Sequence, residues 1–124
     1  MTMRLELVPI AVSDVDATVA FYRDVVGFTL DHDVSPGGGM RVVQLTPPGS
    51  ACSIAFGVGM GSGGPVSNLH LVVDDVEAER AALVGRGLAV SEVQDMGGVL
   101  YAFFADPDGN TWALQEIRVA SLPQ

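Results

Sequence analysis

VSDVDATVA, at Val12–Ala20, and VDDVEAERA, at Val73–Ala81, are two versions of one stretch in which Val, Asp, Val, Ala and Ala stand at matching positions. A second pair follows them in the same order, TPPG at Thr46–Gly49 and DPDG at Asp106–Gly109. Short patterns that recur in one order indicate a duplicated supersecondary unit. The sequence therefore predicts two copies of one module, and each position in the first copy has a counterpart in the second.

Each copy has the pattern of a β-α-β-β-β module. Asp14 and Asp75 are good N-cap residues, and apolar residues at helical spacing follow both. Gly27 and Gly87 then end the predicted helices. The helices are expected from Asp14 to Val26 and from Asp75 to Arg86. Runs with strand composition predict strands at 5–12, 28–34, 40–45 and 51–56 in the first copy and at 67–73, 88–93, 99–105 and 111–117 in the second.

The length of 124 residues predicts a single domain over residues 1–124. We expect module 1 at about residues 5–57, a glycine-rich linker at 57–65 and module 2 at about residues 66–118. Within the linker, Gly59-x-Gly61-x-x-Gly64 matches the dinucleotide-binding fingerprint as a string. Pro65 and a predicted strand follow it, whereas the fingerprint requires a helix. We therefore interpret the glycines as linker.

Composition narrows the classes of function. The chain has 15 acidic and 6 basic residues, a net charge of −9, which argues against nucleic-acid binding because that requires a basic surface. No apolar run is long enough for a membrane span, and no signal-peptide pattern opens the sequence. Cys52 is the only cysteine. These features predict a cytoplasmic protein with no membrane or nucleic-acid partner.

VSDVDATVAFYRDVVGF at Val12–Phe28 and FADPDGN at Phe104–Asn110, taken with the duplication, resemble the vicinal oxygen chelate superfamily. This is the group of glyoxalases, bleomycin-resistance proteins and extradiol dioxygenases, and the resemblance covers nearly the whole chain. It implies an α+β fold in which two tandem β-α-β-β-β modules form curved mixed sheets around a cavity. It also implies a homodimer, since superfamily members of this size are usually dimeric.

The resemblance further implies where a divalent metal would bind, namely on the first and last strands of each module. Counting back from Asp14 and Asp75 puts the first-strand ligands at Leu7 and Asn68. The last-strand ligands fall four residues after Gly49 and Gly109, which gives Ser53 and Ala113. None of these side chains is an imidazole, carboxylate or thiolate. We therefore predict no metal in this position and no cofactor.

The remaining candidates are ligand-binding residues. Because strand residues alternate between faces, His70 should share the face of Asn68, and Gln115 that of Ala113. His70 is also the candidate general acid or base, although a histidine satisfied by a structural hydrogen bond explains it equally well. In module 1 we expect a nearly apolar face whose one polar candidate is Ser53. Tyr101 and Arg41, at matching third-strand positions, are further candidates.

Three functions are compatible with this pattern. The leading hypothesis is a metal-independent protein that binds a small molecule, with sequestration of the bleomycin-resistance type as its expected role. The first alternative is a metal-independent lyase, isomerase or cyclase that uses His70. The second is a non-catalytic dimeric interaction module. The negative charge would suit a cationic ligand, but an acidic surface is also an ordinary property of a soluble protein.

Overall fold

The computed structural model describes residues 1–58 and 63–118. The chain divides into two compact units, Met1–Pro65 with module 1 and Val66–Gln124 with module 2. Much of the predicted linker, and of the glycine string inside it, lies outside the described residues. Within the described part, no helix is long and apolar enough to cross a membrane.

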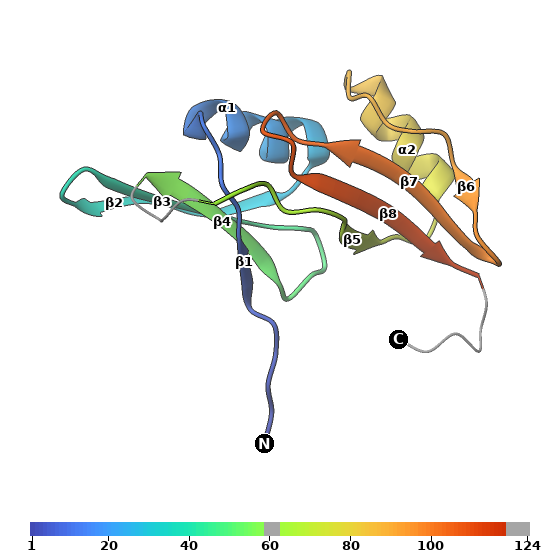
Figure 1. Cartoon of the computed structure of the whole chain (residues 1–124), viewed down its shortest axis with the longest axis horizontal. Helices are drawn as coiled ribbons and strands as arrows, with labels where there is room; N and C mark the ends of the chain where they lie inside the picture. The colour runs from blue at the N-terminus through green and yellow to red at the C-terminus, as the bar shows by residue number, and fades with distance from the viewer. Residues whose placement is uncertain (59–62, 119–124) are drawn as a thin grey trace. The chain divides into compact units, whose positions relative to one another are not determined.

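Module 1 is a four-stranded mixed sheet with helical turns on one face (Figure 1). The strand order is β1-β4-β3-β2, with β1 parallel to β4 and the other neighbours antiparallel. The elements are β1 (Leu7–Pro9), α1 (Val15–Ala20), the π-helix η1 (Phe21–Val26), β2 (Thr29–Gly37), β3 (Met40–Thr46) and β4 (Ser53–Val58).

Module 2 repeats this topology, with strand order β5-β8-β7-β6 and β5 parallel to β8. Its elements are β5 (Leu69–Val72), α2 (Val76–Gly85), β6 (Gln94–Asp95), β7 (Val99–Ala105) and β8 (Thr111–Ile117). Figure 1 shows α2 lying along β7 and β8. The predicted α+β fold with two β-α-β-β-β modules is confirmed.

The repeated Asp of each module caps its helix. Asp14 Oδ1 accepts a hydrogen bond of 3.0 Å from the backbone N–H of Ala17, and Asp75 Oδ1 accepts one of 3.1 Å from that of Ala78. Both caps have extended backbone, as an N-cap requires. A carboxylate at this position also stabilises the helix, because its negative charge lies at the positive end of the helix dipole. The opening repeat is therefore explained by helix initiation.

The apolar side chains of each sheet gather on the face beneath its helical segment. In module 1, Val43, Leu45 and Phe56 are fully buried, and the Phe56 ring lies 6.2 Å from that of Tyr22 in η1. In module 2 the buried Trp112 stacks on Phe104. Because strand residues alternate, their neighbours lie on the opposite face. We call this face, turned away from the helix of the module, the open face.

The DPDG turn of module 2 is a closed structural unit. Asp106 Oδ1 accepts hydrogen bonds of 2.9 Å from the backbone N–H groups of Asp108 and Asn110, and Asp106 Oδ2 accepts one from the Asn110 amide. Asn110 Oδ1 in turn accepts from the backbone N–H of Val66, just before β5. Gly109 takes a φ of 86° that disfavours other residues. The buried carboxylate thus has a structural explanation.

Two predicted elements are wrong in detail. The helix expected up to Val26 changes after Ala20 into a π-helix, in which the Gly27 N–H reaches the carbonyl of Tyr22. The strand expected at 88–93 is absent, and a short strand at Gln94–Asp95 takes its place. There the Arg80 guanidinium binds the Ser91 carbonyl, and Ser91 Oγ accepts from the Phe103 N–H. Side-chain hydrogen bonds therefore replace part of the backbone hydrogen bonding that a strand would have here.

Candidate functional site

Three predicted site residues meet on the open face of module 2. In the sheet, Gln115 lies opposite Tyr101, and Ala113 lies beside His70. Gln115 Nε2 donates a hydrogen bond of 3.1 Å to the Tyr101 hydroxyl. The His70 ring meets the Tyr101 ring edge-on, with centroids 5.9 Å apart. Three adjacent strands, β5, β8 and β7, therefore bring an imidazole, an amide and a phenol together.

Phe103 extends this cluster and was missed from the sequence. Its ring lies nearly parallel to that of Tyr101, at an interplanar angle of 8° and a centroid distance of 5.9 Å. Both rings are half-buried. Alternation along β7 could have placed Phe103 beside Tyr101, because residues two apart share a face. The two rings form a parallel stacked pair, and planar groups pack favourably against aromatic rings of this kind.

Asn68 takes part through its backbone. Its φ of 57° is left-handed, and its N–H donates a hydrogen bond of 2.7 Å to Thr111 Oγ1. Its carbonyl oxygen lies 2.7 Å from His70 Nδ1. When the ring is neutral, the Nδ1 proton must point at that carbonyl, which leaves Nε2 as the hydrogen-bond acceptor. The exposed imidazole is therefore held in one orientation and one tautomer.

The open face of module 1 is polar, so the expectation of a nearly apolar face is wrong. Ser53 Oγ is buried and lies 2.7 Å from Thr46 Oγ1, and Gln44 Nε2 donates to Ser53 Oγ over 3.2 Å. Thr46 Oγ1 also donates to an Asp31 carboxylate oxygen. The expectation considered only β1 and β4, the first and last strands of the module in chain order. Asp31, Gln44 and Thr46 stand on the two strands between them in the sequence, β2 and β3.

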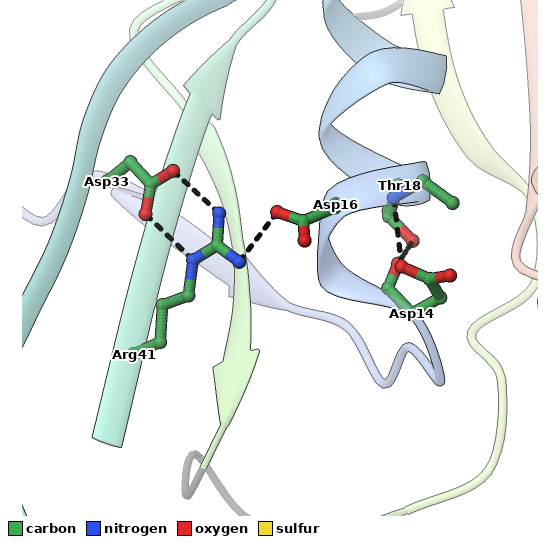
Figure 2. A network of polar contacts seen from close by, with 6 residues as sticks. Asp14, Asp16, Thr18, Asp33 and Arg41 are labelled. Atoms are coloured by element: carbon green, nitrogen blue, oxygen red, sulfur yellow. Dashed lines mark hydrogen bonds and ion pairs between the residues drawn. The ribbon is translucent and has the colours of Figure 1, made fainter. Parts of the chain in front are cut away.

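Arg41 is not on an open face. Figure 2 shows its guanidinium between Asp33 of β2 and Asp16 of α1. It donates two hydrogen bonds of 2.9 and 2.8 Å to Asp33 and one of 2.8 Å to Asp16. These bonds to Asp33, then that to Asp16, raise the pKa of Arg41, and the guanidinium lowers the pKa of the Asp33 carboxyl. Arg41 therefore links the helix to the sheet.

The strand register also changes which residues are counterparts. Ala55 and Gln115 are counterparts, because each lies two residues after the matching positions Ser53 and Ala113. Gln44 lies opposite Ala55, and Tyr101 lies opposite Gln115. The counterpart of Tyr101 is therefore Gln44 and not Arg41.

The same register corrects the first-strand position in module 2. Leu7 pairs with Ser53 in module 1, and His70 pairs with Ala113 in module 2, so His70 rather than Asn68 is the counterpart of Leu7. Counting back from the helix caps failed because the connection from β5 to α2 is shorter than that from β1 to α1.

With this correction, the four expected ligand positions do not fit a divalent metal. They are Leu7, Ser53, His70 and Ala113, which offer one imidazole and one neutral hydroxyl. Divalent transition metals need several imidazole, carboxylate or thiolate ligands. Among residues 1–58 and 63–118, no three His, Cys, Asp or Glu side chains are grouped so as to hold a metal ion.

Comparison with known proteins identifies the family. The model of the Glyoxalase/Bleomycin resistance protein/Dioxygenase superfamily matches residues 4–114. The chain belongs to this superfamily. No curated protein matches the chain.

Solved structures of the superfamily resemble the chain over nearly its whole length. TnmS3, an antibiotic binding protein from Streptomyces sp. CB03234, is 33% identical, with a TM-score of 0.81 over 94% of this chain and 97% of that one. A glyoxalase/bleomycin resistance protein from the same strain is 34% identical, with a TM-score of 0.75 over 90% and 98%. A superfamily member from Sphaerobacter thermophilus DSM 20745 is 27% identical, with a TM-score of 0.80 over 93% and 98%.

Proposed function

We propose that this superfamily member binds a small planar molecule, without a metal, on the open face of module 2. The stacked pair of Tyr101 and Phe103 carries this proposal, because half-buried aromatic rings favour stacking contacts with planar ligands. Gln115 and His70 border the rings with polar groups that would orient such a ligand. The similarity to an antibiotic binding protein supports sequestration of an antibiotic-like compound as the role.

The donor set supports the metal-independent form of this proposal. One imidazole and one hydroxyl at the superfamily's ligand positions cannot hold a divalent ion tightly. Ligand binding should therefore be unchanged after treatment with EDTA. A stoichiometric metal whose removal abolishes binding would contradict the proposal.

The binding test uses 2-naphthalenemethanol, a neutral planar probe, titrated into ¹⁵N-labelled protein. We expect the largest amide shifts in β5, β7 and β8. Tyr101→Ala and Phe103→Ala should weaken binding roughly ten-fold each, the scale of one lost aromatic contact and its buried area. Val84→Ala is the matched control, because Val84 is an exposed apolar residue on α2. Absence of probe binding, or equal losses in the control, would overturn the proposal.

A metal-independent lyase, isomerase or cyclase is the second candidate. The observation that favours it is the contact between the Asn68 carbonyl and His70 Nδ1, which leaves Nε2 available as a base. The test is to incubate a bound ligand with the wild-type protein and with His70→Gln, and to follow the ligand by mass spectrometry. Conversion by the wild type alone, with binding retained in the variant, would make the protein an enzyme. An unchanged ligand in both samples would leave it a binding protein.

We further propose a cytoplasmic homodimer. Exposed valines on strands of both modules support self-association, with Val34 and Val58 each 50% exposed and Val72 65% exposed. The net charge of −9 supports a small molecule rather than a nucleic acid as the partner. A dimer that binds no probe would favour the remaining alternative, a non-catalytic interaction module.

A further inference from the structure

The polar cluster on the open face of module 1 has one direction of hydrogen bonding. Thr46 has one hydroxyl proton, which it donates in its hydrogen bond to the Asp31 carboxylate. The contact of 2.7 Å between Thr46 and Ser53 must then use the Ser53 proton. Ser53 is left as an acceptor, which matches the donation from Gln44 Nε2. Gln44 therefore donates to Ser53, Ser53 donates to Thr46, and Thr46 donates to Asp31.

This direction determines what the cluster offers to a ligand. Both hydroxyl protons are committed inside the cluster. Within residues 1–58 and 63–118, neither Asp31 Oδ1 nor Gln44 Oε1 accepts a hydrogen bond. Acceptor oxygens therefore dominate, and Asp31 adds a negative charge. A ligand group that matches this surface must donate hydrogen bonds, and a positive charge on it strengthens each bond.

Alternation along β2 places the Asp31 carboxylate on this face, because Thr29, two residues earlier, lies opposite Thr46. Leu30 pairs with Leu45 and His32 with Gln44, so Asp31 is an extra residue with no partner across the strands. This β-bulge puts His32 opposite Gln44, on the open face with Asp31, which contacts Thr46. In a regular strand His32 would face the core beneath the helix. Bulges commonly redirect side chains beside functional sites.

We infer that the cluster of Asp31, Gln44, Thr46 and Ser53 is a binding site for a protonated amine carried by a small-molecule ligand. This inference rests on the proposed small-molecule function and names the chemical class of ligand that the open face of module 1 would bind. Ser53 is buried, with 4% of the residue exposed, so the site is part of the packed sheet. The net charge of −9 attracts cations to the molecule and disfavours anionic ligands.

Three probes of one shape test the inference: 2-naphthylmethylamine as its ammonium ion, 2-naphthalenemethanol, and 2-naphthoate. Calorimetry should rank their affinities ammonium, then alcohol, then carboxylate. The ammonium probe alone should shift the amide resonances of β2 and β3. Asp31→Asn should weaken ammonium binding on the order of ten-fold and leave the alcohol unaffected, because it removes the charge and keeps an acceptor.

Two further variants secure the result. Glu92→Gln removes an exposed carboxylate from module 2 and controls for overall charge. Thr46→Val keeps the shape but deletes the hydroxyl that positions Asp31, and should also weaken ammonium binding. Equal affinity for ammonium and alcohol, or equal losses in Asp31→Asn and Glu92→Gln, would overturn the inference while leaving the proposed function intact. Binding of none of the probes would overturn both.

Discussion

Asn68 shows how one residue prepares the site of module 2. Among the described residues, it is the one non-glycine residue with a positive φ. Left-handed backbone costs an L-residue with a Cβ about 1–2 kcal/mol, and Asn tolerates it better than most. This conformation lets the Asn68 N–H donate a hydrogen bond to Thr111 Oγ1 while the Asn68 carbonyl contacts His70 Nδ1. The strain is therefore connected to the orientation of the imidazole.

Replacement of Asn68 should separate backbone from side-chain effects. Asn68→Gly should retain wild-type stability, because glycine adopts φ of 57° without a penalty. Asn68→Ala should lower the free energy of unfolding by about 1 kcal/mol, as measured by urea denaturation. If alanine proved as stable as glycine at this position, the left-handed backbone would not be under strain.

At the scale of elements, α2 is held to its sheet by a carboxylate. Glu116 Oε1 accepts a hydrogen bond of 2.8 Å from the N–H of Val76, the first residue of α2, and Oε2 accepts one from Arg118. The bond from Arg118, followed by that from Val76, lowers the pKa of Glu116 in the folded protein. Glu116, which is itself buried, thus anchors the helix to its sheet.

This contact predicts a pH dependence of stability. A lowered folded pKa means that the stabilisation is complete above the ordinary carboxyl pKa, near 4.5, and is lost as the pH falls through the folded value. Glu116→Gln should therefore melt several degrees lower than wild type at neutral pH. The gap should narrow as the pH falls below about 4. A gap in melting temperature that stays constant down to acidic pH would contradict this role.

Arg41 connects three elements of module 1, and its two carboxylate partners should differ in strength. Asp33 receives both arms of the guanidinium and its side chain is 32% exposed, whereas Asp16 receives one and is 85% exposed. Exposed ion pairs contribute little because water screens them. Double-mutant cycles with Arg41→Gln should give a larger coupling to Asp33→Asn than to Asp16→Asn. Added salt should reduce both couplings, and a dominant coupling to Asp16 would contradict the geometry.

On the scale of the whole molecule, the two modules share topology but offer different chemistry. Module 1 carries acceptor oxygens on its open face, and module 2 carries aromatic rings with an imidazole. Duplication explains the common fold, while divergence at matching strand positions explains the difference. Gln44 and Tyr101 are one such pair.

Homodimer formation is the prediction at this scale. Light scattering after size-exclusion chromatography should give about twice the 12.9 kDa of one chain. Val72→Asp, which places a charge on an exposed valine of β5, tests whether that strand takes part. A mass of one chain at micromolar concentration would rule out the dimer.

The sequence by itself determined the module type, the duplication and the helix starts, because these depend on local patterns. Caps, turn residues and apolar periodicity act over a few neighbouring positions, and both copies repeat them. These local patterns also identified His70, Tyr101 and Gln115 as candidate site residues.

Only the tertiary structure decided which side chains meet. The pairing of β5 with β8 made His70, and not Asn68, the counterpart of Leu7, and the bulge in β2 moved His32 onto the open face, opposite Gln44. Register depends on hydrogen bonds between residues far apart in the chain, and a shift of one residue moves every side chain to the opposite face. The loop between β5 and α2, two residues shorter than its counterpart, was enough to misplace a count made from the helix cap. Local patterns therefore specify most of the elements, and non-local pairing specifies the chemistry of their surfaces.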